Sequence, residues 1–74
     1  MREKIKIHTE FIKLDNFVKF SGISTTGGEA KNLILNGEIK VNNDVCKMRN
    51  KKIKDKDIIS YKDKEFEVEF FDNK

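Results

Sequence analysis

The chain has 74 residues, of which 16 are basic, 13 are acidic and only 36% are hydrophobic, and its formal net charge is +3. A chain of this length forms one small domain, which buries only about 60% of the surface that its unfolded chain exposes, so its apolar core must be small. One cysteine, Cys46, and one histidine, His8, exclude an internal disulfide and a zinc site built from such ligands, so we expect a reducing, cytoplasmic setting with no metal or cofactor.

The first predicted element is a short strand near the N-terminus. Ile5 and Ile7 alternate with polar residues, which is typical of a strand with one face buried. His8 would lie on the polar face of this strand. No second histidine and no evident nucleophile accompanies it, so we assign His8 no chemical role.

A first helix is expected at about residues 13–21. Apolar residues recur there at three- and four-residue spacing, which places one apolar stripe on a short helix. The stripe consists of Leu14, Phe17 and Val18, with Phe20 as a further candidate. Gly22 suits the end of this helix, because glycine readily adopts the left-handed conformation that follows a helix.

A second helix is expected at about residues 27–36. Thr26 is followed three residues later by Glu29, a capping box in which each side chain satisfies a free backbone N–H of the helix start. Since only a few residues separate the two helices, they should pack as a tight pair. The buried stripe of the second helix is formed by Ala30, Leu33 and Ile34, and the helix ends at Asn36-Gly37.

The rest of the chain predicts strands. Residues 39–45 form a hairpin, because Asn42-Asn43-Asp44 tolerate the left-handed conformation of a tight turn between apolar positions. A further strand is expected at 58–61, and phenylalanine and valine alternate with glutamate in a last, amphipathic strand at 66–70. We therefore expect one α+β domain over residues 1–74, in which two short packed helices lie against a small, mostly antiparallel sheet.

Charge is unevenly distributed along the chain. Residues 1–56 hold 13 basic residues against seven acidic ones, whereas residues 57–74 hold three against six. The densest basic segment is residues 47–56. A segment of this kind is typical either of a polyanion-binding site or of a solvated connection between strands. That segment contains one acidic residue, Asp55, and six basic ones, which are Lys47, Arg49, Lys51, Lys52, Lys54 and Lys56.

The two terminal strands carry complementary charges. Lys4 and Lys6 lie on the outer face of the first strand, and Glu67 and Glu69 lie on the outer face of the last. We therefore expect these strands to lie side by side with cross-strand ion pairs, worth only about 0.2–1 kcal/mol each when exposed. This arrangement would keep the acidic strand away from the basic face.

An ordered set of short motifs covers residues 13–60, about 48 of the 74 residues. In order, they are Lys13-Leu14-Asp15, Gly22, Glu29-Ala30-Lys31, Leu33-Ile34, Gly37, Ile39, Val41-Asn42, Val45, the basic run and Asp57-Ile58. Their order and spacing resemble the α-L RNA-binding motif, first described in a small-subunit ribosomal protein and shared by pseudouridine synthases. The form Ser24-Thr25-Thr26-Gly27-Gly28-Glu29-Ala30-Lys31 looks like the small, stand-alone YaaA-like branch of that family.

Three positions depart from the family pattern. Gly27 stands where many members carry arginine, so backbone N–H groups would replace a guanidinium there. Lys13 stands where arginine is commonest, which leaves a point charge in place of a bidentate fork. Lys56 replaces the glycine before Asp57, which allows a different turn conformation.

The resemblance implies a phosphate-binding face. A helix N-terminus offers free N–H groups and the positive end of the helix dipole, and glycines let a phosphate come close. The alternative is that these glycines only allow close helix packing. The candidate RNA-binding residues are Lys13, Lys19 and Lys31 on the helices, Thr25, Thr26, Gly27 and Gly28 at the second helix start, and Arg49, Lys51 and Lys52 in the basic run, whereas Lys47, Lys54 and Lys56 contribute or are only solvated.

Other chemistry has little support in the sequence. Phe17, Phe20 and Tyr61 could stack on bases, but core packing explains Phe17 and Tyr61 better, and Phe20 is the most open case. No serine–histidine, cysteine–histidine or metal-binding constellation occurs at useful spacing, so we expect no enzymatic activity. No apolar stretch approaches the roughly 20 residues that span a bilayer, so we expect no membrane partner.

The function implied by the resemblance is RNA binding. We expect a monomeric protein that recognises the shape and phosphates of structured RNA, in ribosomal RNA or on the assembling or translating ribosome. One alternative is a protein-interaction module whose basic face docks an acidic partner such as a replication or repair factor. A further alternative is a module that binds transfer RNA.

Overall fold

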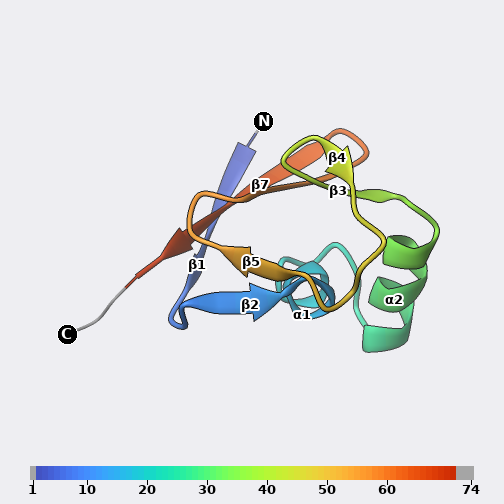
Figure 1. The fold of residues 1–74 in the computed structure, drawn as a ribbon, viewed down its shortest axis with the longest axis horizontal. Helices are drawn as coiled ribbons and strands as arrows, with labels where there is room; N and C mark the ends of the chain where they lie inside the picture. The colour runs from blue at the N-terminus through green and yellow to red at the C-terminus, as the bar shows by residue number, and fades with distance from the viewer. Residues whose placement is uncertain (1, 72–74) are drawn as a thin grey trace.

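The computed structural model describes residues 2–71, which form an α+β fold as expected (Figure 1). Five strands form one sheet in the order β1-β7-β6-β3-β4, and β2 and β5 form a separate two-stranded sheet. The elements are β1 (Arg2–Ile7), β2 (Phe11–Lys13), α1 (Leu14–Phe20), α2 (Gly27–Leu35), β3 (Ile39–Val41), β4 (Asp44–Val45), β5 (Lys52–Lys54), β6 (Ile58–Tyr61) and β7 (Lys64–Phe70). Apart from the parallel pair β1–β7, the strand pairs are antiparallel, as predicted.

Both helices lie where the sequence predicts them. The N–H of Glu29 donates to Thr26 Oγ1 at 3.1 Å, which confirms the cap of α2. The return bond of the capping box comes from the N–H of Thr25 to Glu29 Oε1, also at 3.1 Å, and therefore lies one residue earlier than in the usual motif. Gly22 and Gly37 follow the two helices with φ of +88° and +76°, the left-handed conformation that favours glycine at these positions.

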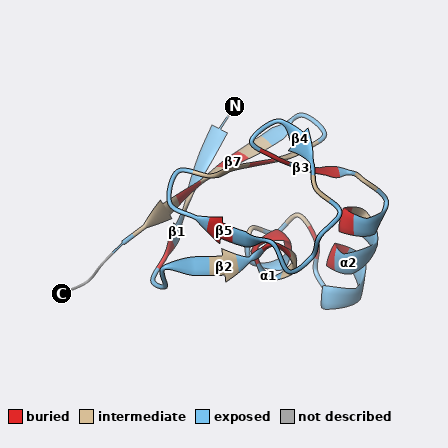
Figure 2. Cartoon of the chain, viewed as in Figure 1, coloured by how far each residue is buried: buried red, intermediate tan, exposed pale blue. Residues whose placement is uncertain are grey.

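The core is formed by side chains from both helices and both sheets (Figure 2). The rings of Phe17 on α1 and Phe66 on β7 meet edge to face, with centroids 6.4 Å apart, and so join the helix layer to the large sheet. Leu33 is only partly buried, and Phe20 is 61% exposed, so Phe20 does not belong to the apolar stripe of α1. The fully buried side chains include Leu14, Val18, Ala30, Ile34, Ile39, Ile53 and Ile59.

The terminal strands β1 and β7 are neighbours, as predicted, with Lys4 opposite Glu67 and Lys6 opposite Glu69. The prediction that these two lysines form ion pairs is wrong. Among residues 2–71 only Arg2 makes ion pairs with acidic side chains, to Glu65 at 3.3 Å and to Glu67 at 3.6 Å. The forked guanidinium of Arg2 reaches two carboxylates at once. Lys6 instead places its Nζ 5.7 Å from the centroid of the Phe71 ring.

The basic run is more than a connection between strands. Its residues 52–54 form β5, which pairs with β2, and neither of these three-residue strands was expected from the sequence. Ile53 of β5 is fully buried, which anchors the small sheet to the core. In Figure 1 this sheet lies beside α1, and the turn that follows β5 is hydrogen-bonded to β7, where the N–H of Lys56 donates to the carbonyl of Val68 at 2.7 Å.

Candidate nucleic-acid interface

The small sheet presents basic side chains to solvent. Lys13 of β2 lies opposite Lys52 of β5, and Phe11 lies opposite Lys54. Because side chains alternate along a strand, Ile12 and Ile53 face the core and the other side chains face outward. The name basic ribbon is used below for this outward face, which consists of Phe11, Lys13, Lys52 and Lys54.

The start of α1 holds the rest of the basic segment next to the ribbon. No side chain caps this helix. Instead, the N–H of Leu14 donates to the carbonyl of Lys51 at 2.9 Å, and the N–H of Asp15 donates to the carbonyl of Arg49 at 3.1 Å. These bonds satisfy helix N–H groups that have no partner within the helix. Four of the predicted RNA-binding residues, Lys13, Arg49, Lys51 and Lys52, are thereby brought together, and all four are exposed.

The lysines of the ribbon lack acidic partners among residues 2–71, where every ion pair involves Arg2. The two aspartates that follow β5 accept backbone hydrogen bonds instead. Asp55 Oδ1 accepts from the N–H of Phe70 at 2.9 Å, and Asp57 Oδ2 accepts from the N–H of Lys54 at 2.8 Å. Like charges directly opposite each other destabilise a strand pair, so the pair Lys13–Lys52 is unfavourable in the free protein.

Two residues of the α-L motif, Asn42 and Asp57, hold this region together through hydrogen bonds. The side chain of Asn42 donates to Asp57 Oδ1 at 3.2 Å and accepts from the N–H of Ile58 at 2.9 Å. These bonds tie the β3–β4 hairpin to the turn that follows β5. In that turn Lys56 has a φ of +72°, so the conformation that favours glycine is kept although the residue is lysine.

The start of α2 exposes the second group of predicted residues. Thr25, Thr26, Gly27 and Gly28 are all exposed, and a Cβ added at either glycine would meet no atom within 4 Å. Close helix packing therefore does not require these glycines. The carboxylate of Glu29 is bound to the N–H of Thr25 at the same helix start, so one negative charge already lies beside the proposed phosphate position.

The remaining predicted lysines are more dispersed. Lys19 lies in the last turn of α1, and Lys31 lies on the exposed side of α2. Among residues 2–71, no hydrogen bond or ion pair links them to the basic ribbon. The structure therefore assembles one compact basic group around β2, β5 and the start of α1, with Lys19, Lys31 and the start of α2 on the adjoining helices.

A groove of about 700 Å³ adjoins the ribbon on the side of the β3–β4 hairpin. Lys52 and Lys54 of the ribbon also line this groove, together with Lys47 and Lys51. Apolar residues, which include Val45 and Met48, and two acidic ones, Asp44 and Asp57, complete the lining. Lys47 and Lys54, which were weaker candidates from the sequence, thus lie beside the predicted basic residues.

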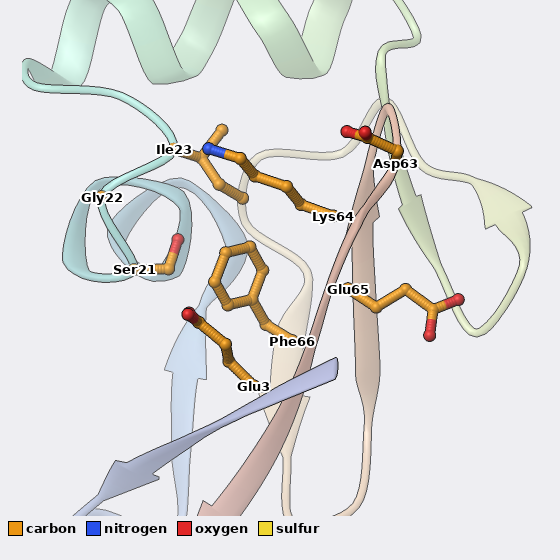
Figure 3. A pocket seen from close by; sticks show the side chains of 8 residues that line it. All are labelled: Glu3, Ser21, Gly22, Ile23, Asp63, Lys64, Glu65 and Phe66. Carbon is orange, nitrogen blue, oxygen red and sulfur yellow. The ribbon is translucent and has the colours of Figure 1, made fainter. Parts of the chain in front are cut away.

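A second pocket, of about 390 Å³, has the opposite character (Figure 3). It lies between β1, the end of α1 and the turn between β6 and β7, and the carboxylates of Glu3 and Asp63 line it together with a single lysine, Lys64. In Figure 3 the side chain of Lys64 extends toward Ile23, while Glu65 points to the other side. Its excess of negative charge makes this pocket unsuitable for phosphate.

The aromatic residues divide into core and surface groups. Phe17 is fully buried and Tyr61 is partly buried against the core, so core packing accounts for both. Phe20 is exposed at the end of α1 and does not belong to the basic ribbon. The sequence analysis missed Phe11, which is 39% exposed within the basic ribbon. The available signal was the alternation of Phe11, Ile12 and Lys13, which is too short to specify a strand.

Residues 2–71 contain no group of three histidine, cysteine, aspartate or glutamate side chains placed to hold a metal ion. In the same part of the chain, no helix is long and apolar enough to cross a membrane. The basic residues gathered around β2, β5 and the start of α1, on a small α+β fold, are typical of a polyanion-binding module.

Comparison with known families identifies that module. The model of the S4 domain matches residues 5–69. Because this match covers most of the chain, the chain belongs to the S4 domain family, whose members are RNA-binding modules and not enzymes in themselves. The comparison with curated proteins gives no match.

Proposed function

We propose that this protein binds structured RNA through the basic ribbon and the start of α1, in ribosomal RNA or on the ribosome during its assembly or translation. The observation that carries the proposal is the position of Lys13 directly opposite Lys52, with no acidic partner for either among residues 2–71. Proteins retain such local conflicts mainly at functional sites. A phosphate between the two ammonium groups would convert their repulsion into attraction.

The chemistry of this surface suits a phosphate backbone. Lysine and arginine contacts to phosphate release counterions and supply affinity that does not depend on base sequence. Structured A-form RNA offers proteins its shape, phosphates and 2′-hydroxyls more readily than its base edges. We therefore infer that the RNA-binding residues are Lys13, Arg49, Lys51 and Lys52, joined by Lys19, Lys31 and the exposed start of α2.

We further propose that the protein binds RNA as a monomer, in the cytoplasm. Ribosomal and transfer RNA share the phosphate backbone and the A-form helices that such a surface recognises. Crosslinking the protein to RNA in cells and sequencing the attached RNA would distinguish the two. Recovery of an acidic protein in place of RNA would favour the alternative of a protein-interaction module.

Salt dependence tests whether the basic residues contact phosphates. If Lys13, Lys31, Arg49, Lys51 and Lys52 do so, the logarithm of the association constant should fall with the logarithm of salt concentration with a slope on the order of −3 to −5. Filter binding of a purified RNA hairpin between low and moderate salt measures this slope. A slope near zero would contradict the proposal.

The start of α2 is tested by a charge placed at Gly28. Gly28→Glu has room for its side chain, because no atom lies within 4 Å of the added Cβ. A carboxylate in the first turn of a helix does not destabilise it, but it should repel a phosphate and lower RNA affinity by about fivefold to tenfold. Gly28→Gln is the matched uncharged control. A folded Gly28→Glu protein with unchanged affinity would show that this helix start is only structural.

A further inference from the structure

Phe11 is the aromatic side chain that the basic ribbon exposes. A single exposed apolar side chain is ordinary on a protein surface, so its surroundings decide whether it has a role. Lys54 lies directly across from Phe11, Lys52 lies on the diagonal, and Lys13 lies two residues along the same face. Each of these positions is within about 8 Å of Phe11 along or across the strands.

The ring of Phe11 already attracts a cation. The Nζ of Lys52 lies 4.9 Å from the ring centroid, in a cation–π contact, and the side chain as a whole remains 39% exposed. At an exposed site such a contact is weaker than the stacking of a nucleobase on an aromatic ring. A base can therefore displace Lys52 from the ring, which leaves the ammonium group free to contact the adjoining phosphate.

The backbone holds Phe11 in place. Its strand pairs with β5, and the hydroxyl of Thr9 donates to the carbonyl of Phe11 at 2.7 Å. The neighbouring Ile12 packs against the core, so the outward direction of Phe11 is set by the alternation of the strand. The ring is thus presented on a fixed element, as in the stacking surfaces that other proteins offer to unpaired bases.

We propose that Phe11 forms a site for one unpaired nucleobase of RNA, with the base stacked on its ring and the adjoining phosphates bound by Lys13, Lys52 and Lys54. This inference rests on the proposed function and narrows it. The preferred RNA contains an unpaired nucleotide next to a helix, because bases within a continuous helix are stacked on each other and cannot reach the ring. All four bases have a flat face, so the site selects for an unpaired base and not for its identity.

The test compares two RNA hairpins that differ in one base. One carries a single bulged adenosine, and its twin carries an abasic nucleotide at the same position, so that both have the same phosphates. The wild-type protein should bind the first hairpin roughly 5- to 150-fold more tightly than the abasic twin. In Phe11→Ala this preference should fall below about twofold, with little change in affinity for the abasic hairpin.

Three further variants separate stacking from structure. Phe11→Ile keeps an apolar strand former without a flat ring, so it should lose the preference even if Phe11→Ala folds poorly. Phe11→Trp should keep it. Phe71→Ala is the matched control, because Phe71 is 45% exposed and also lies beneath a lysine, Lys6, but follows β7 and does not belong to the basic ribbon. It should leave the preference unchanged.

The outcomes distinguish this inference from the proposed function. Equal binding of the two hairpins by the wild-type protein, together with a steep salt dependence, would overturn the Phe11 site and leave phosphate binding intact. An undiminished preference in both Phe11→Ala and Phe11→Ile would also overturn it. Salt-independent binding, or no binding, of both hairpins would overturn the site and the proposed function together.

Discussion

The strand pairs β1–β7 and β2–β5 use charge in opposite ways. In β1–β7, Arg2 pairs with Glu65 and Glu67, and lysines face glutamates across the strands. In β2–β5, Lys13 faces Lys52 and no acidic side chain within residues 2–71 pairs with either. The first arrangement supports strand pairing, whereas the second opposes it.

The difference shows which forces hold each pair. The ribbon β2–β5 forms despite its charge because Ile53 is fully buried and because the carbonyls of Arg49 and Lys51 accept hydrogen bonds from the start of α1. Burial of an isoleucine is worth about 1.5–3 kcal/mol, which exceeds the effect of an exposed charge pair. The apolar side of the ribbon therefore maintains the fold, and its basic side remains available for a ligand.

The largest expected effect is on stability, from truncation of the buried anchor of β5. Ile53→Ala should lower the free energy of unfolding by about 2–5 kcal/mol, because it leaves a cavity in the core. Its neighbour in the same strand supplies the control: Lys52→Ala should change stability by no more than about 0.5 kcal/mol. Urea denaturation measures both. A smaller loss for Ile53→Ala than for Lys52→Ala would mean that charge, and not burial, holds the ribbon.

Smaller changes in stability, of opposite sign in the two strand pairs, are expected when their exposed charges are removed. Arg2→Ala removes two exposed ion pairs and should lower the free energy of unfolding by up to about 1 kcal/mol. Lys13→Val removes the like-charge contact without disturbing the cation–π contact of Lys52 with Phe11, and it adds a residue with high strand propensity. It should therefore leave stability unchanged or raise it by about 0.2–0.5 kcal/mol. Thermal unfolding at low salt would show the contrast most clearly, since salt screens both interactions. If Lys13→Val destabilises the protein as much as Arg2→Ala, the like-charge argument is wrong.

Local signals in the sequence were sufficient for much of the fold. The apolar spacing of α1, the capping box at Thr26 and Glu29, and the asparagines between β3 and β4 each depend on residues close together in the chain. The charge complementarity of β1 and β7 predicted a contact between the two ends of the chain. It did not predict which side chains pair, because Arg2 binds Glu67, the carboxylate opposite Lys4, and Lys6 lies over the Phe71 ring.

The ribbon could not be predicted in the same way. β2 and β5 have three residues each and one inward side chain each, so neither shows enough alternation to indicate a strand. Their pairing joins segments about 40 residues apart in the chain. The candidate lysines were found from the density of the basic run and from the resemblance to the α-L motif, whereas the position of Phe11 among them depends on the strand pairing. For that reason the basic character of the site was predictable and its aromatic component was not.

The most direct test of the central claim compares the two strand pairs in one measurement, the salt dependence of RNA affinity. The double variant Lys13→Ala/Lys52→Ala removes two lysines from the ribbon, and Lys4→Ala/Lys6→Ala removes the same charge from β1. The ribbon variant should make the log–log slope for a structured RNA hairpin less negative by about 1.4–1.8, the loss of two phosphate contacts. The β1 variant should leave the slope at its wild-type value. Equal changes in both variants, or no change in the ribbon variant, would contradict the assignment of RNA binding to the basic ribbon.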